Sequence, residues 1–194
     1  MKSEINKMDL NGVNVIYDGE QKQIETNFTS LAIAGVLIIV IIYLILFVQF
    51  KSFIQPLVII YSLPLSLIGV IMGLLMCDMP LSLTAVMGII SLIGVVIRNA
   101  ILLVEYIIEG RHEGLSIDEA CIHAVSLRFR PIILSSTATI TGLVPLALSN
   151  STLFGPMSVT IIFGLASATF LTFIVVPVMY SLVNTKLEER QAKK

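Results

Sequence analysis

One arginine lies near the middle of a long apolar run, and its position makes it the residue of greatest chemical interest in the chain. Arg98 follows Val95, Val96 and Ile97 in the run GVVIRNAILLVEY. A charge at the centre of a membrane span costs about 3 kcal/mol on insertion scales, so such residues face protein or water and have a partner. We therefore expect Arg98 and its neighbour Asn99 to belong to a functional polar site.

Two other polar residues share a helix stripe with this arginine. Ser91, Arg98 and Glu105 are spaced seven residues apart, which places them on one side of a helix. Glu105 lies nearer the end of the run and is a weaker candidate for a functional carboxylate. No other apolar stretch carries Asp or Glu near its middle. The counter-charge of Arg98 must therefore come from another polypeptide segment, or hydroxyls and carbonyls must take its place.

A second polar group is a series of hydroxyls that follows Pro131. Its members are Ser135, Ser136, Thr137, Thr139 and Thr141. Ser135 and Thr139 are one helical turn apart. Such hydroxyls either join helices through hydrogen bonds or line a path for protons, and their spacing does not separate these two interpretations. Ser135 and Thr139 are candidate relay residues with Arg98 and Asn99, and Ser136 is a weaker one.

The composition indicates the kind of protein that holds these residues. Hydrophobic residues make up 56% of the 194-residue chain and charged residues 13%, whereas an ordinary soluble domain has about 25% charged residues. A bilayer is the solvent that accommodates this much apolar surface. The net charge of -1 argues against nucleic acid as a partner. No phosphate loop, nucleophile elbow or metal-ligand spacing occurs, so we expect no cofactor, no metal site and no enzyme activity.

The apolar stretches predict an all-α membrane protein. A transmembrane helix needs about 20 mostly apolar residues. Residues 30–184 supply five such stretches, at about 30–50, 56–77, 81–108, 131–149 and 154–183. The spans also contain glycines that predict close helix packing. These are Gly69, Gly73, Gly88, Gly94, Gly142 and Gly164.

The segment between the third and fourth spans has a different pattern. Residues 115–128 mix apolar with charged residues, and Ser116 lies three residues before Glu119 as in a capping box. This pattern predicts a short amphipathic helix along the cytoplasmic interface. Pro131 would then occupy the first turn of the fourth span, where its missing N–H costs little.

Basic residues set the predicted orientation. Lys51, the segment 111–130 and the tail at 185–194 fall on one side of alternating spans, and the opposite side receives no Lys or Arg between spans. The positive-inside rule makes the first side cytoplasmic. Residues 1–29 are then outside although no signal peptide precedes them, so we expect further helices upstream in a longer protein. Alternation at residues 13–17 is compatible with a short strand.

Three runs in the sequence resemble a known family. QFKSFIQPLVIIYSLPLSLIG, GVVIRNAILLVEY and LRFRPIILSSTATITGLVPLALS resemble the last membrane segments of RND efflux permeases of the AcrB/AcrD/AcrF type. The resemblance extends from about Tyr17 to Asn184, and YDGEQKQIETNF resembles the end of the second periplasmic porter loop. It implies a bacterial inner-membrane permease of twelve helices in two similar halves, of which this chain supplies the eighth to the twelfth.

The same resemblance implies partners and a mechanism. Members of the family work as trimers that export drugs or other amphiphiles by proton influx, with a periplasmic adaptor and an outer-membrane channel. Coupling in the family uses two aspartates in the fourth helix, a basic residue in the tenth and a hydroxyl in the eleventh. The basic position falls on Arg98 and the hydroxyl position on Ser135, whereas the helix with the aspartates has no counterpart in this chain.

The resemblance also shows one departure from the best-known members, which carry lysine where this chain has Arg98. Arginine is effectively never deprotonated. Arg98 can therefore hold a counter-charge but cannot carry the proton itself. We hypothesise that it stabilises the ionised form of a carboxylate from the absent N-terminal half and releases that group when it is protonated.

Other functions remain open at this point. The chain could be a membrane scaffold or accessory subunit that packs against a full permease. It could also be a related exporter of proteins or lipids from the same superfamily, although the runs at 94–106 and 128–148 favour the drug-exporting branch. On the leading interpretation its partners are the absent half of the permease and the lipid bilayer, and alone it would be inactive.

Overall fold

The fold consists entirely of helices in the part of the chain that can be described. A computed structural model describes residues 20–149 and 151–192. These residues contain no strand, which confirms the predicted all-α class. The helices are α2 (Glu20–Phe50), α3 (Ile54–Ile60), α4 (Ser62–Met76), α5 (Leu83–His112), α6 (Ile117–Leu148) and α7 (Phe154–Ala192).

Five segments are long and apolar enough to cross a membrane, which confirms the five predicted spans. They are Glu25–Phe50, Ile54–Met76, Leu83–His112, Ile117–Leu148 and Phe154–Thr185. The first helix begins at Glu20, well before the expected boundary at residue 30. The strand expected at residues 13–17 lies outside the described residues. The second span is divided into α3 and α4 at Tyr61, three residues before Pro64, which has no N–H to donate to the carbonyl of Ile60.

Helix α6 combines two elements that we predicted as separate helices, the amphipathic helix at 115–128 and the fourth span at 131–149. The predicted capping box is present: Ser116 Oγ accepts from the Glu119 N–H at 3.3 Å, and Glu119 Oε2 accepts from the Ser116 N–H at 3.0 Å. The helix then continues through Pro131 to Leu148, so the break expected between residues 128 and 131 is wrong. Pro131 removes only the bond to the carbonyl four residues earlier, and the bonds on either side keep the helix continuous.

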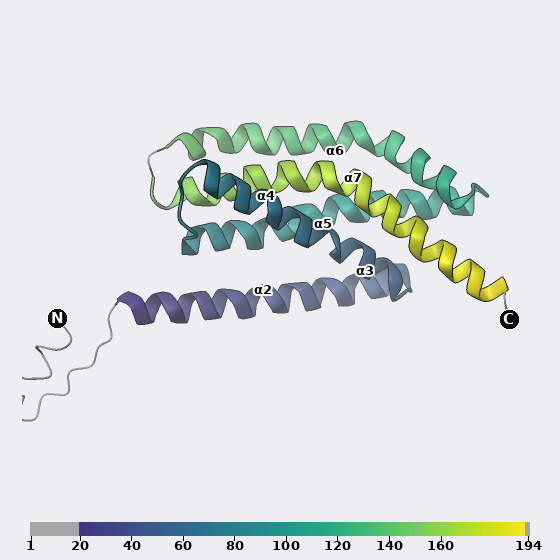
Figure 1. Cartoon of the computed structure of the whole chain (residues 1–194), viewed down its shortest axis with the longest axis horizontal. Coiled ribbons are helices and arrows are strands. Elements are labelled where there is room, and N and C mark those ends of the chain that lie inside the picture. The colour runs from purple at the N-terminus through teal and green to yellow at the C-terminus, as the bar shows by residue number, and fades with distance from the viewer. Residues whose placement is uncertain (1–19, 150, 193–194) are drawn as a thin grey trace, which may run out of the picture.

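Helix α7 lies at the centre of the bundle and packs against α4, α5 and α6 (Figure 1). Glycines permit this close approach, as predicted. A Cβ at Gly69 or Gly73 would overlap α7 at Ser167 or Phe163, and a Cβ at Gly164 would overlap Leu92 of α5. Gly94 and Gly142 behave differently, because a Cβ there would meet no neighbouring side chain or helix within 4 Å.

Helix α2 is the least covered element (Figure 1). Its only buried apolar residue is Leu46, near its C-terminal end, among the residues whose burial is described. At the same end, Gln49 Nε2 donates a hydrogen bond of 2.6 Å to Glu105 Oε1 of α5. The bundle of α3–α7 is therefore one packed unit, and α2 joins it through its last turns.

Candidate coupling site

An uncovered stripe along α5 contains the predicted arginine. Met87, Ser91, Gly94 and Arg98 are all exposed, and they follow one another at spacings of four, three and four residues. The opposite side of the helix is buried, with Leu92, Val96, Ala100 and Leu103 at most 1% exposed. Residues at these spacings share one helix face. The packed bundle therefore covers one side of α5 and leaves bare the side that carries Arg98.

Arg98 has no electrostatic partner in the described part of the chain. None of the described residues forms a hydrogen bond or an ion pair with its guanidinium. The sequence left open whether Arg98 pairs with hydroxyls of the fourth span or with a group from another segment. The arrangement of this chain does not contain the first kind of pair.

Asn99 points away from the arginine beside it. Its side chain is 3% exposed and therefore belongs to the buried face of α5. Consecutive residues in a helix are separated by about 100° around its axis. The structure does not bring Asn99 and Arg98 together on one surface, although they are neighbours in the sequence.

The two predicted relay hydroxyls lie on the outer side of α6. Ser135 is half-buried and donates to the carbonyl of Ile132 at 3.1 Å, and exposed Thr139 donates to the carbonyl of Ser135 at 3.0 Å. Each hydroxyl has one proton, which it gives to its own helix. The oxygen lone pairs remain free, so both side chains can accept a hydrogen bond from a cation, a water molecule or a protonated carboxyl group.

Ser136 has a different environment from its neighbour Ser135. It is 5% exposed and lies 2.9 Å from Thr169 Oγ1 of α7. Thr169 gives its proton to the carbonyl of Leu165 at 2.7 Å, so Ser136 must be the donor in the contact between the two hydroxyls. This is an interhelical hydrogen bond of the kind that joins membrane helices. Within the series, Ser135 and Thr139 thus form an outward pair, whereas Ser136 faces inward and forms an inward pair with Thr169 of α7.

Glu105 is engaged at the base of α2 by the hydrogen bond from Gln49 described above. No described residue links it to Arg98, although both belong to the stripe that begins at Ser91. Its observed contact therefore ties α2 to α5.

Arg128 is a residue that the sequence reasoning missed. Its guanidinium carbon lies 3.7 Å from the centroid of the Tyr106 ring, so this cation stacks on an aromatic ring between α6 and α5. Its Nε is buried and has no hydrogen-bond partner among the described residues. The signal in the sequence was a basic residue set between Leu127 and Phe129 at the edge of a span.

Arg98 can therefore supply a permanent positive charge on α5, and Ser135 and Thr139 can supply two acceptor hydroxyls on α6, but none of these described side chains forms a contact with another that would join them into one site. Gly94 lies one turn from Arg98, and Gly142 lies close in sequence to Thr139. Small residues at these uncovered positions would allow another helix to approach closely. The chemistry that this arrangement permits is the binding of an anionic group carried by such a helix.

Comparison with known proteins agrees with this arrangement. The AcrB/AcrD/AcrF family profile matches residues 1–184. The swarming motility protein SwrC of Bacillus subtilis is 37% identical over 188 residues, which cover 94% of this chain and 18% of SwrC. The multidrug resistance protein MdtC of Proteus mirabilis is 38% identical over 174 residues, which cover 88% of this chain and 17% of MdtC.

A solved structure has the same fold. The crystal structure of a heavy metal efflux pump matches with a TM-score of 0.77 and 26% identity, over 94% of this chain and 19% of the pump. The chain thus spans less than a fifth of each of these relatives. The extent of the family match and the shared helical fold lead to one conclusion: the chain belongs to the AcrB/AcrD/AcrF family of RND permeases.

Proposed function

We propose that this chain forms the C-terminal half of the membrane domain of a proton-driven efflux transporter, with Arg98 as the fixed positive charge of its coupling site. The observation that carries the proposal is the bare stripe of α5, where Arg98 is exposed and lacks a partner among the described residues. A charge left against lipid is costly. A carboxylate from a segment outside this chain would remove that cost.

The proposed cycle follows from the chemistry of the two groups. While the partner carboxylate is ionised, Arg98 attracts it and holds the two segments together. Protonation of the carboxylate removes the attraction, because arginine keeps its charge throughout. Ser135 and Thr139 then accept hydrogen bonds from Arg98 or from the protonated group, using their free lone pairs. Arg98 and the hydroxyls act as positioning groups, and the carboxylate carries the proton.

The uncovered glycines support the same proposal. Gly94 and Gly142 make no contact that would explain the absence of a side chain, whereas Gly69, Gly73 and Gly164 are explained by packing inside this chain. A helix seated on the stripe would explain Gly94 and would bring its carboxylate to Arg98 one turn away. The proposed partner is therefore a closely packed helix, not a loop or a lipid.

The wider assembly is proposed from the family resemblance. We place the chain in the bacterial inner membrane with its C-terminal tail in the cytoplasm, since its basic loops all fall on that side. We also propose a trimer that works with a periplasmic adaptor and an outer-membrane channel. Drugs or other amphiphiles are the proposed cargo, supported by relatives named multidrug resistance proteins.

The test is substitution of Arg98 in the complete transporter, with substrate export and proton uptake measured in proteoliposomes. Arg98→Ala and Arg98→Gln should abolish proton-coupled export, whereas Arg98→Lys should retain it because the charge remains. Ser91→Ala is the matched control on the same stripe and should leave export unchanged. Full export by Arg98→Ala would refute the proposed role of the charge.

A further inference from the structure

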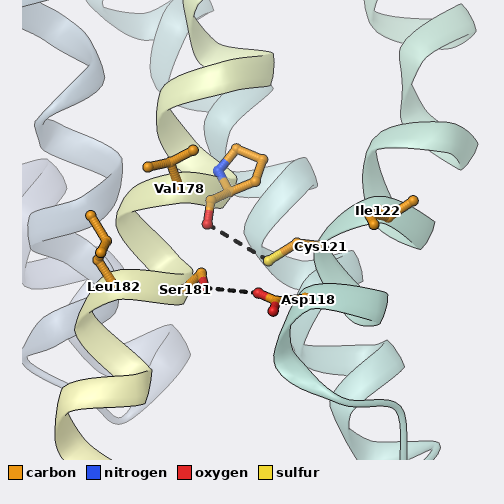
Figure 2. Close-up of a pocket in the computed structure, with 7 residues that line it drawn as sticks. Asp118, Cys121, Ile122, Val178, Ser181 and Leu182 are labelled. Atoms are coloured by element: carbon orange, nitrogen blue, oxygen red, sulfur yellow. Dashed lines mark hydrogen bonds between the residues drawn. The ribbon is translucent and has the colours of Figure 1, made fainter.

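A groove between the start of α6 and the last turns of α7 lies outside the coupling site. It has a volume of about 370 Å³ and is lined mainly by Asp118, Cys121 and Ile122 of α6 and by Pro177, Val178 and Ser181 of α7 (Figure 2). At the bottom of the groove, the thiol of Cys121 donates a weak hydrogen bond to the carbonyl of Pro177 at 3.7 Å, so α6 and α7 are in contact there. Its walls are thus formed by two helices that pack against each other.

The groove has an apolar end and a polar end. Ile122 and Val178 are 68% and 51% exposed, so their side chains are not covered by the bundle. At the other end, Ser181 Oγ donates to Asp118 Oδ1 at 2.9 Å (Figure 2). The polar end lies toward the edge of the membrane, since the sequence after Thr185 changes from apolar to the charged run KLEER. A membrane amphiphile has an apolar chain and a polar headgroup. The apolar side chains of the groove suit the chain, and the carboxylate at the membrane edge suits the headgroup.

The carboxylate at the polar end retains a free oxygen. The neighbouring Glu119 is occupied by the capping box, where its Oε2 accepts from both the N–H and the hydroxyl of Ser116. Asp118 accepts only the Ser181 hydroxyl among the described residues, so its second oxygen is open. An exposed carboxylate attracts a cationic donor and repels an anionic group. The favoured headgroup therefore carries an ammonium with N–H donors.

We propose that this groove binds a phospholipid with a primary ammonium headgroup, of the phosphatidylethanolamine class. The acyl chain lies along Ile122 and Val178, and the ammonium donates to Asp118. This proposal requires only that the chain resides in a membrane. It would stand if the coupling role of Arg98 failed.

Native mass spectrometry of the 194-residue chain in detergent tests the proposal. The probes are phosphatidylethanolamine, phosphatidylcholine and phosphatidylglycerol with identical acyl chains. Phosphatidylethanolamine should bind about two- to fivefold more tightly than the other two, the range for one exposed ion pair. Asp118→Asn should remove that preference. Glu119→Gln is the matched control and should keep it, because glutamine retains the capping box.

Several results would overturn the proposal. Equal affinities for the three lipids would exclude recognition of the ammonium, and an equal loss in Glu119→Gln would indicate a general charge effect. Val178→Phe fills the apolar end and should weaken all three lipids, so unchanged binding in that variant would place the lipid elsewhere. A dimer that persists at saturating phosphatidylethanolamine but is lost in Val178→Phe would show that a second copy of the chain occupies the groove.

Discussion

The contact between α4 and α7 gives the sharpest quantitative prediction. A methyl group at Gly69 would overlap Cβ of Ser167 and the backbone carbonyl of Phe163. Neither atom can turn aside as the end of a flexible side chain can, so the two helices must move apart. Insertion of a methyl group into a packed interior costs about 1–3 kcal/mol. We expect Gly69→Ala to lower the free energy of unfolding by about 3 kcal/mol, at the upper end of that range.

Gly94→Ala is the matched change on the bare stripe of α5. A methyl group there meets no neighbouring side chain or helix within 4 Å. Alanine favours a helix over glycine by up to about 1 kcal/mol, so this variant should be neutral or slightly more stable. The two glycine-to-alanine changes should thus differ by about 3–4 kcal/mol in the isolated chain.

The assay measures reversible unfolding of the isolated chain in bicelles or mixed micelles, with steric trapping as the method that gives the free energy of unfolding. Equal free energies of unfolding for the two variants would refute the packing described for α4 and α7. The complete transporter provides a second comparison, because a helix seated on the stripe would leave no room for a methyl group at Gly94. Gly94→Ala should impair export there, and full export would refute close packing of a partner helix at that position.

Two further predictions concern hydrogen bonds. Ser136→Ala and Thr169→Ala should each lower the free energy of unfolding by about 1 kcal/mol. The double variant should cost little more than either single change. If the two losses simply add in the double variant, the two hydroxyls do not interact. Ser116→Ala removes the helix cap and should cost about 1 kcal/mol, measured by the same unfolding assay. Ser126→Ala is its control, because the Ser126 hydroxyl only donates to a carbonyl of its own helix at 2.9 Å, and a cost equal to that of Ser116→Ala would argue against the capping role.

The spans could be predicted because a transmembrane helix needs about 20 mostly apolar residues, which the sequence shows directly. Each predicted apolar stretch lies in helical segments, for example Leu83–His112 for the third span, although the helices that hold the first and fourth spans begin earlier, at Glu20 and Ile117. Prolines were harder to interpret, because their effect depends on neighbouring helices. Pro131 was expected to begin a span but lies inside α6, whereas Pro64 accompanies a break in the second span.

The polar site was predicted less completely, because residue spacing shows which side chains share a helix face but not which other helices pack against that face. The stripe through Ser91 and Arg98 followed directly from seven-residue spacing. The sequence could not show that Asn99 faces the buried side, that Ser136 bonds Thr169 or that Glu105 accepts from Gln49. The latter two depend on which helices are neighbours, and α7 became central only through tertiary packing.

The division of the hydroxyls on α6 bears directly on the proposed coupling. Ser135 and Ser136 are adjacent, yet one faces outward and the other forms a buried contact with Thr169. A rotation of about 100° separates them around the helix axis. The inward pair fixes α6 on α7, so the outward hydroxyls are held at a defined angle relative to the bundle. A rigid acceptor of this kind costs little reorganisation when a proton arrives, since its own proton already bonds a helix carbonyl.

If Ser136 and Thr169 set that angle, Thr169→Ala should weaken export by the complete transporter although it touches no part of the bare stripe, and Thr169→Ser should restore it. Export that is insensitive to Thr169→Ala would mean that the outward hydroxyls do not need this support.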